Sequence, residues 1–469
     1  MKLKPKLASV QTWEDDPGEP PIGRTPIQRP TPEVSHPSLP VSVAGEPPAE
    51  SGDYPGSAEF RYWAAADAMS RASNFWGPLM PANTTWNGSV GQVLTAQLDS
   101  GDDLNAYYDR SGLCFFRHTV AGVTVHSGES PDVVCHEAGH AVLDALRPQF
   151  WGVLSAEVGA FHESFGDMSA ILSSLGVGAV ADEVLTETQG NPARSSRLSR
   201  LAEQLGWAIR QIDPSAVDRD CLRNAANNFF YRDPVTLRPS EPASQLSSEV
   251  HSFSRVFTGA FLDAVAGIFY QQPARDGDAL VQAGQIMGRL LVAALLATPT
   301  VPALYAQVAA HMLAADKALY DGRYGPALRS AFVRHGILSP SEAVAADQAA
   351  PQHLAAITGV VPEPGADLGT VTVPAERYGL TEPFTASAPS EQPRFAVAGA
   401  DPAIGSLTPA DPAKAAETFI EDLFRQGRIA VADEFLTTSA AVVDGTRTRT
   451  HQVTRQDSGG LVLDRLLFL

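Results

Sequence analysis

The 469-residue sequence has few cysteines, no long uninterrupted apolar run and no excess of basic residues. Its three cysteines are too few, and odd in number, to build a disulfide framework. No apolar run approaches the roughly 20 residues that cross a bilayer, and the best, residues 290–297, is expected to be a helix fragment. With 34 basic and 53 acidic residues the net charge is −19, which argues against nucleic acid or an anionic membrane as a partner.

The N-terminus carries no signal-peptide pattern, because residues 1–7 run into acidic residues 14–16 without an apolar core. We therefore expect a protein that works in the cytoplasm or is released by a non-classical route. Residues 1–55 show no apolar period, and eleven of the 36 prolines lie before Gly52. Since proline removes donors and fixes φ, this segment is predicted to be a disordered tail. The alternative is a short inhibitory or partner-binding arm.

Residues 133–146 form an apolar run that contains an H-E-x-x-H pattern, His136-Glu137-Ala138-Gly139-His140. On an α-helix, residues four apart share a face, so the two imidazoles can point at a single metal ion. Glu137 projects about 100° further round the helix, where it reaches a water on the metal rather than the metal. The pattern predicts a zinc site with Glu137 as the base. A core helix that happens to carry two histidines is the alternative.

A second apolar-periodic segment, Val158–Met168, follows after a gap suited to a loop. Its carboxylates Glu163 and Asp167 lie four apart and share a helix face. One of them can bind the metal, while the other accepts the outer ring N–H of a ligand histidine and fixes its tautomer. Two histidines and one carboxylate leave the fourth position of a tetrahedral zinc open for water, which is typical of catalytic sites.

The two segments resemble the catalytic helices of the thermolysin family of zinc metallopeptidases, whose second motif is G-A-x-x-E-x-x-x-D, here Gly159 to Asp167. Other stretches agree with that family in their order: Leu104–Tyr108, Leu222-Arg223, Val250–Ser252 and, at the end of its helical subdomain, Ala331–Ile337. The resemblance covers about Ser57 to Leu338. It implies one zinc ion held by His136, His140 and Glu163, with Asp167 as the acceptor behind a ligand histidine.

The resemblance also implies roles around the metal. Asn105 and Ala106 belong to an edge strand that pairs with the substrate backbone. Arg223 holds a substrate carbonyl on the leaving-group side, and His251 stabilises the oxyanion. The residues themselves leave other roles open: a turn position for Asn105, a surface salt bridge for Arg223, and for His251 a helix-start histidine bonded to its own backbone.

The sequence departs from the family pattern in three places. The gap between His140 and Glu163 is a few residues longer than in the family. Leu246, rather than an acidic residue, stands five positions before His251, although Glu249 is near. The loop before the second motif has Phe150, Trp151 and Leu154 where the family has a tyrosine. These departures concern transition-state stabilisation rather than zinc binding.

Asp132, four residues before His136, is predicted to cap the zinc helix after Pro131. In the family the matching aspartate also helps to bind calcium. A calcium site needs several oxygens at once, and the downstream segment offers only Asp182, Glu183 and Glu187. Capping is therefore favoured over a calcium ion. Cys135 and His162 stand beside ligand residues in the sequence but are expected to face away from the metal.

The pattern of elements predicts the α+β class. An amphipathic helix over 58–75 precedes short strands with turn signals, and helical patterns dominate after Ile171. We expect a two-lobed catalytic region over 56–340, in which the zinc helix lies between a small antiparallel sheet and a helical bundle. Residues 341–368 are predicted to be a linker, and residues 369–469 a small α+β accessory domain without a chemical motif.

The leading hypothesis is a zinc endopeptidase that acts on a peptide or protein substrate. The alternative is a catalytically weak or inactive zinc-binding scaffold with a recognition role. Glu137 favours the enzyme, because metal binding alone does not require it. An aminopeptidase would need an acidic cluster for the substrate's α-amine, and the sequence has no G-x-M-E-N stretch.

Overall fold

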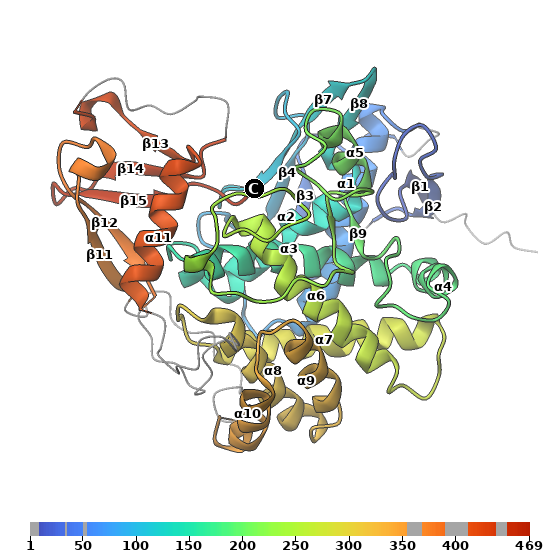
Figure 1. The fold of residues 1–469 in the computed structure, drawn as a ribbon. Helices are drawn as coiled ribbons and strands as arrows, with labels where there is room; N and C mark the ends of the chain where they lie inside the picture. Colours follow the sequence, from blue (N-terminus) through green and yellow to red (C-terminus); the bar gives the residue numbers. More distant parts are fainter. Residues whose placement is uncertain (1–8, 33–34, 50–53, 354–367, 390–410, 438–447) are drawn as a thin grey trace, which may run out of the picture.

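The computed structural model describes residues 9–32, 35–49, 54–353, 368–389, 411–437 and 448–469. The protein is a mixed α+β structure, which confirms the predicted class. Helices form the centre and lower part of the molecule in Figure 1, and small sheets lie around them.

Three long helices form the centre of the fold: α1 (Ala58–Trp76), α2 (Pro131–Leu146) and α3 (Ala156–Leu175). All residues of α2 and α3 are buried, which explains their apolar composition. The cap of α2 is Ser130, whose hydroxyl accepts from Val133 N, with Pro131 in the first turn. The predicted cap Asp132 is wrong; its carboxylate accepts from Ala202 N at 3.0 Å instead.

Further helices pack below this centre and form the bundle that the sequence predicts: α6 (Val250–Phe269), α7 (Gly277–Ala297), α8 (Leu304–Tyr320), α9 (Gly325–Arg334) and α10 (Pro340–His353). The first half of the predicted linker is thus the helix α10, and residues 354–367 lie outside the described residues. On the other flank are α4 (Gly178–Glu187), α5 (Glu203–Arg210) and the two-residue strands β9 (Arg200–Leu201) and β10 (Arg223–Asn224).

By length and composition, α6 and α7 are apolar enough to cross a membrane, and up to three spans result if the bent pair α3 and α4 counts as one. This corrects the expectation that no stretch approaches that length. The apolar windows of α6 and α7 are 89% and 72% buried inside the protein, so they contribute to the core of the bundle.

A four-stranded sheet lies over α1 and α2, in the order β3 (Val41–Val43), β4 (Leu94–Gln97), β6 (Leu113–Phe115) and β5 (Ala106–Tyr108). It is mixed rather than antiparallel, because β3 and β6 both run parallel to β4 and only β5 and β6 are antiparallel. The strands β7 (Arg117–Val120) and β8 (Val123–His126) form a separate hairpin. The strand β5 is at the edge of the sheet and faces α2.

The N-terminal segment is packed where it is described, in contrast to the predicted tail. The strands β1 (Ser9–Thr12) and β2 (Ile27–Pro30) form a hairpin against α1, and β3 joins the four-stranded sheet. Trp13 packs edge-on against Phe60, and the buried Asp16 accepts from the Ser130 hydroxyl at 2.6 Å. These contacts are with residues far along the chain, so the local proline content did not reveal them.

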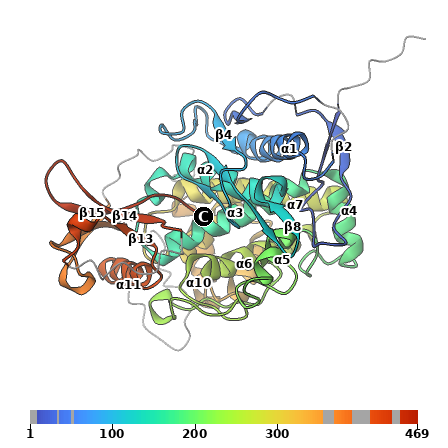
Figure 2. The same cartoon turned by 90° about the horizontal axis from the view of Figure 1, so that it is seen from above.

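The accessory domain is a five-stranded mixed sheet, covered by α11 (Pro412–Arg425), in the order β11 (Gly369–Val373), β12 (Phe384–Ala388), β15 (Leu461–Arg465), β14 (His451–Arg455) and β13 (Ile429–Val431). The last two strands, β14 and β15, pair antiparallel. The domain docks on the loop before α3, because Leu154 N donates to Ser387 O and Arg465 Nε donates to Trp151 O. Figure 2 shows it at one side of the helical centre.

Candidate metal centre

Two neighbouring helices bring the predicted ligands together. His136 and His140 come from α2, and Glu163 comes from α3. One ligand atom from each of the three lies within 4.8 Å of the others, and all three residues are buried. His136 Nε2 is 3.3 Å from Glu163 Oε2, and His140 Nε2 is 3.8 Å from Glu163 Oε1. Within the described part of the chain, no other group of three such side chains meets this way.

These residues fit a zinc ion. His140 is fully buried, and neither ring nitrogen has a hydrogen-bond partner among the described residues. A buried polar atom without a partner costs free energy, so it needs a ligand that the protein does not supply. Two imidazole nitrogens and one carboxylate oxygen form a donor set that zinc prefers, with one position left open. Burial lowers the pKa of His140 to about 3, which keeps its ring neutral, as a metal ligand must be.

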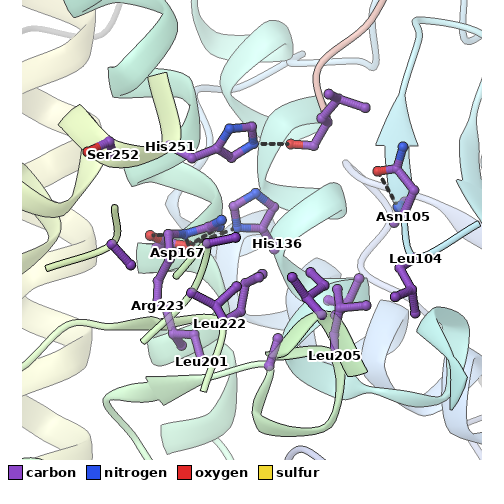
Figure 3. A pocket seen from close by; sticks show the side chains of 18 of the residues that line it. Leu104, Asn105, His136, Asp167, Leu201, Leu205, Leu222, Arg223, His251 and Ser252 are labelled. Atoms are coloured by element: carbon purple, nitrogen blue, oxygen red, sulfur yellow. Dashed lines mark hydrogen bonds and ion pairs between the residues drawn. The ribbon is translucent and has the colours of Figure 1, made fainter. Parts of the chain in front are cut away.

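A chain of contacts holds His136 in place. Its Nδ1 lies 3.1 Å from Asp167 Oδ1, which leaves Nε2 directed at the ligand cluster. Asp167 in turn accepts from Arg223 Nη2 at 2.8 Å (Figure 3). Burial opposes the charged form of Asp167, but Arg223 and His136 hold its pKa well below the ordinary value. Arg223 is therefore not the surface salt bridge considered above; it pairs with a buried carboxylate behind the ligand.

Glu137 is buried beside the ligands and takes no part in their cluster. Its Oε2 has no hydrogen-bond partner in the described residues. Burial raises the pKa of Glu137 to about 8; His136 opposes this rise and Glu163 adds to it. Glu137 lines a cavity of about 440 Å³ together with His136, Asp167, Arg223 and His251.

His251 is in the first turn of α6 and points its ring into this cavity (Figure 3). Its Nδ1 is 2.6 Å from Glu249 Oε1, and its Nε2 is 3.3 Å from Glu163 Oε2. Glu249 also caps α6 by accepting from Ser252 N. The ring is thus held by a carboxylate two residues away, and not by its own backbone. Position 246 is a leucine and cannot hold the ring, but Glu249 supplies the carboxylate partner.

Two of the predicted substrate-binding residues, Asn105 and Ala106, line the cavity on the side away from Arg223 (Figure 3). Asn105 Oδ1 accepts from Ala106 N at 2.9 Å, and its amide nitrogen is 3.3 Å from both Asp103 and Thr448. These local bonds match the turn role that the sequence left open for Asn105. Ala106 begins β5, whose outer edge is not covered by another strand of the sheet.

Sequence reasoning missed the two glycines that let α2 and α3 approach. A Cβ built on Gly139 would lie 3.0 Å from Gly166 Cα and 2.7 Å from Ser169 Cβ. Gly139 is the fourth residue of the H-E-x-x-H pattern, so its position on the helix face toward α3 could have indicated close packing.

The acidic residues considered for calcium do not meet. Asp132 is buried and pairs with Ala202 N, whereas Asp182 accepts from Gly277 N and Glu187 accepts from Arg197 N. Burial, followed by the nearby Asp16 and Asp15, raises the pKa of Asp132 well above its ordinary value.

Comparison with known proteins adds no assignment: no protein-family model matches the sequence, and no curated protein is similar to it.

Proposed function

We propose that the protein is a zinc-dependent endopeptidase with a thermolysin-like arrangement of its catalytic region. The observation that carries the proposal is the position of Glu137, buried next to the cluster of His136, His140 and Glu163, with its Oε2 without a hydrogen-bond partner in the described residues. A site that only stored or displayed zinc would not need a buried carboxyl group there, because an unpaired buried carboxyl group is unfavourable.

Each residue has a distinct task in the proposed reaction. When bound, zinc polarises the peptide carbonyl and lowers the pKa of water. Glu137 takes the proton of the attacking water and delivers it to the leaving amine. His251 donates from Nε2 to the carbonyl oxygen as negative charge develops there, while Glu249 holds the other ring nitrogen.

Asp167 on α3 and Arg223 on β10 support these groups. Asp167 keeps the His136 ring in one tautomer, and Arg223 neutralises Asp167. Arg223 also lines the cavity, so its remaining N–H groups are available to a substrate carbonyl on the leaving-group side. The edge strand β5, beginning at Ala106, offers backbone groups to an extended peptide.

The proposal is tested by following cleavage of casein and of a labelled peptide library, with the protein zinc-loaded, chelated, and chelated then resupplied with zinc. We expect cleavage within peptide chains that is lost on chelation and returns with zinc. If the protein binds one equivalent of zinc but cleaves none of these substrates, the result would favour the alternative of a zinc-binding scaffold without peptidase activity.

A further inference from the structure

The last residues of the sequence lie on the outer edge of β5, next to the candidate metal centre. Tyr108 N donates to Phe468 O at 3.0 Å, and Phe468 N donates to Tyr108 O at 2.9 Å. This reciprocal pair is an antiparallel bridge, which is how an extended peptide adds to a sheet edge. Figures 1 and 2 both place the end of the chain, marked C, beside α2.

The ring of Phe468 fills a flat slot beside the zinc ligands. Its centroid is 3.9 Å from that of His162 and 5.1 Å from that of His140, and both pairs are stacked. Arg465 covers the ring, with Cζ 4.0 Å from the centroid, and Trp151 meets it edge-on. The side chain is 1% exposed. Two imidazoles that each stack on the Phe468 ring, a guanidinium and an indole edge form a slot suited to a planar aromatic group.

The next residue brings a backbone carbonyl to the proposed catalytic histidine. Leu469 O accepts from His251 Nε2 at 3.2 Å, a contact drawn in Figure 3. Leu469 also lines the cavity that contains His136 and Glu137. The segment therefore places a main-chain oxygen on the same ring nitrogen that the proposed reaction assigns to a substrate carbonyl.

The accessory domain delivers this segment. Phe468 is three residues after the end of β15, and Leu466 N donates to Thr450 O at 2.8 Å, which continues the sheet pairing. Arg465 holds both the slot, through its contact with Phe468, and the loop before α3, through Trp151 O. The segment that links β15 to Phe468 is therefore short. The sheet holds it at one end, and the ring contacts of Phe468 hold it at the other.

We propose that residues 467–469 occupy the peptide-binding groove as an intramolecular ligand, and that the external ligand this groove takes is an extended peptide with an aromatic side chain at the position of Phe468. The proposal deepens the proposed function, since it names the substrate class and the inhibitor of the same site. A bound peptide would make the same three contacts as this segment: a bridge to β5, an aromatic ring in the slot, and a main-chain oxygen on His251.

A tethered segment competes strongly with a free peptide. A short linker gives an effective concentration on the order of millimolar. The affinity measured for an external peptide then falls by the fraction of molecules in which the groove is open. Emptying the slot should therefore strengthen external peptide binding without changing the metal ligands.

The test measures binding of a fluorescent hexapeptide, Asp-Arg-Leu-Leu-Phe-Leu, which copies residues 464–469, to the zinc-loaded full-length protein by anisotropy. The test variant is Phe468→Ala. The matched control is Phe435→Ala, which removes a buried phenylalanine from the accessory core but leaves the slot filled. We expect Phe468→Ala to bind the peptide at least about tenfold more tightly than wild type or the control. A hexapeptide with alanine in place of its phenylalanine should lose most of that affinity.

Equal affinity of wild type and Phe468→Ala, or equal affinity of the two hexapeptides, would overturn the proposal. If Phe468→Ala does not fold by circular dichroism, deletion of residues 467–469, which keeps β15 complete, is judged by the same criteria. If neither variant folds, Phe468 is a fixed part of the core and not a displaceable ligand, which also overturns the proposal. Anisotropy needs no turnover, so selective peptide binding without any cleavage would reject only the proposed peptidase.

Discussion

A Cβ added to Gly166 would lie 2.6 Å from both Cε1 and Nδ1 of His136. The imidazole of His136 thus occupies the space that any side chain at position 166 would need. The same ring atom, Nδ1, is the one that contacts Asp167. The orientation of His136 depends on the missing side chain of Gly166 on one side of the ring and on the carboxylate of Asp167 on the other.

Gly166→Ala should therefore displace His136 and weaken zinc binding, because real Cβ contacts are not this short. The matched control is Gly178→Ala, near the start of α4, where an added Cβ meets no atom within 4 Å. Zinc per chain after dialysis, measured by elemental analysis, should fall in the first variant alone. Equal zinc in both would show that the ring has room to move.

Asp167→Asn keeps the shape of the side chain but removes the charge that pairs with His136 and Arg223. Loss of such a partner behind a metal ligand typically costs about 10- to 100-fold in affinity. We expect that loss in a competition titration with a chromophoric chelator. An affinity equal to that of the wild type would mean that His136 is oriented without the carboxylate.

His251→Ala should lower kcat by about 10²–10³-fold, because one donor to the developing oxyanion is removed. Zinc content and thermal stability should stay near wild type, since His251 is not a member of the ligand cluster. His118→Ala, which alters a histidine paired with the exposed Asp102, is the control. Peptide-cleavage kinetics that match those of the control would exclude His251 from the reaction.

Glu157 should make the protein less stable as pH rises. Burial raises its pKa to about 8 from an ordinary value of 4.5, although Tyr231 and the backbone of Tyr305 donate to it. The folded state holds a proton that the unfolded state releases between these values. The contribution of protonated Glu157 to the free energy of unfolding is therefore complete below the unfolded pKa. It is lost as pH rises through the folded pKa, by up to about 1.4 kcal/mol per pH unit.

Glu157→Gln cannot ionise, so its unfolding midpoint in urea should fall less than that of wild type between pH about 5 and about 8. Parallel decreases in the two proteins would show that other groups cause the pH dependence.

Local patterns predicted the parts of this protein that depend on nearby residues. The helical period identified α1, α2, α3 and the bundle, and the four-residue spacing placed His136 with His140 and Glu163 with Asp167 on shared faces. These features follow from helix geometry, which is set by residues a turn apart.

Contacts between distant parts of the chain were not predictable in this way. The proline-rich start looked unstructured because nothing local shows that Trp13 packs on Phe60 or that Asp16 binds Ser130. Glu249 pairs with the His251 ring, whereas the family resemblance implied an acidic partner at position 246, where this sequence has Leu246. Phe468 stacks on His162, 306 positions earlier in the sequence, and no periodicity links the residues after β15 to α2 and α3.

In the function proposed here, Glu137 performs chemistry at a zinc site that does not need it for metal binding. The most direct measurement is the peptide-cleavage rate of Glu137→Gln relative to wild type, with both proteins shown to hold one equivalent of zinc. Because the amide cannot accept the proton of water, we predict full zinc occupancy and a rate at least about 10²-fold lower. A rate close to wild type at equal zinc content would contradict the account.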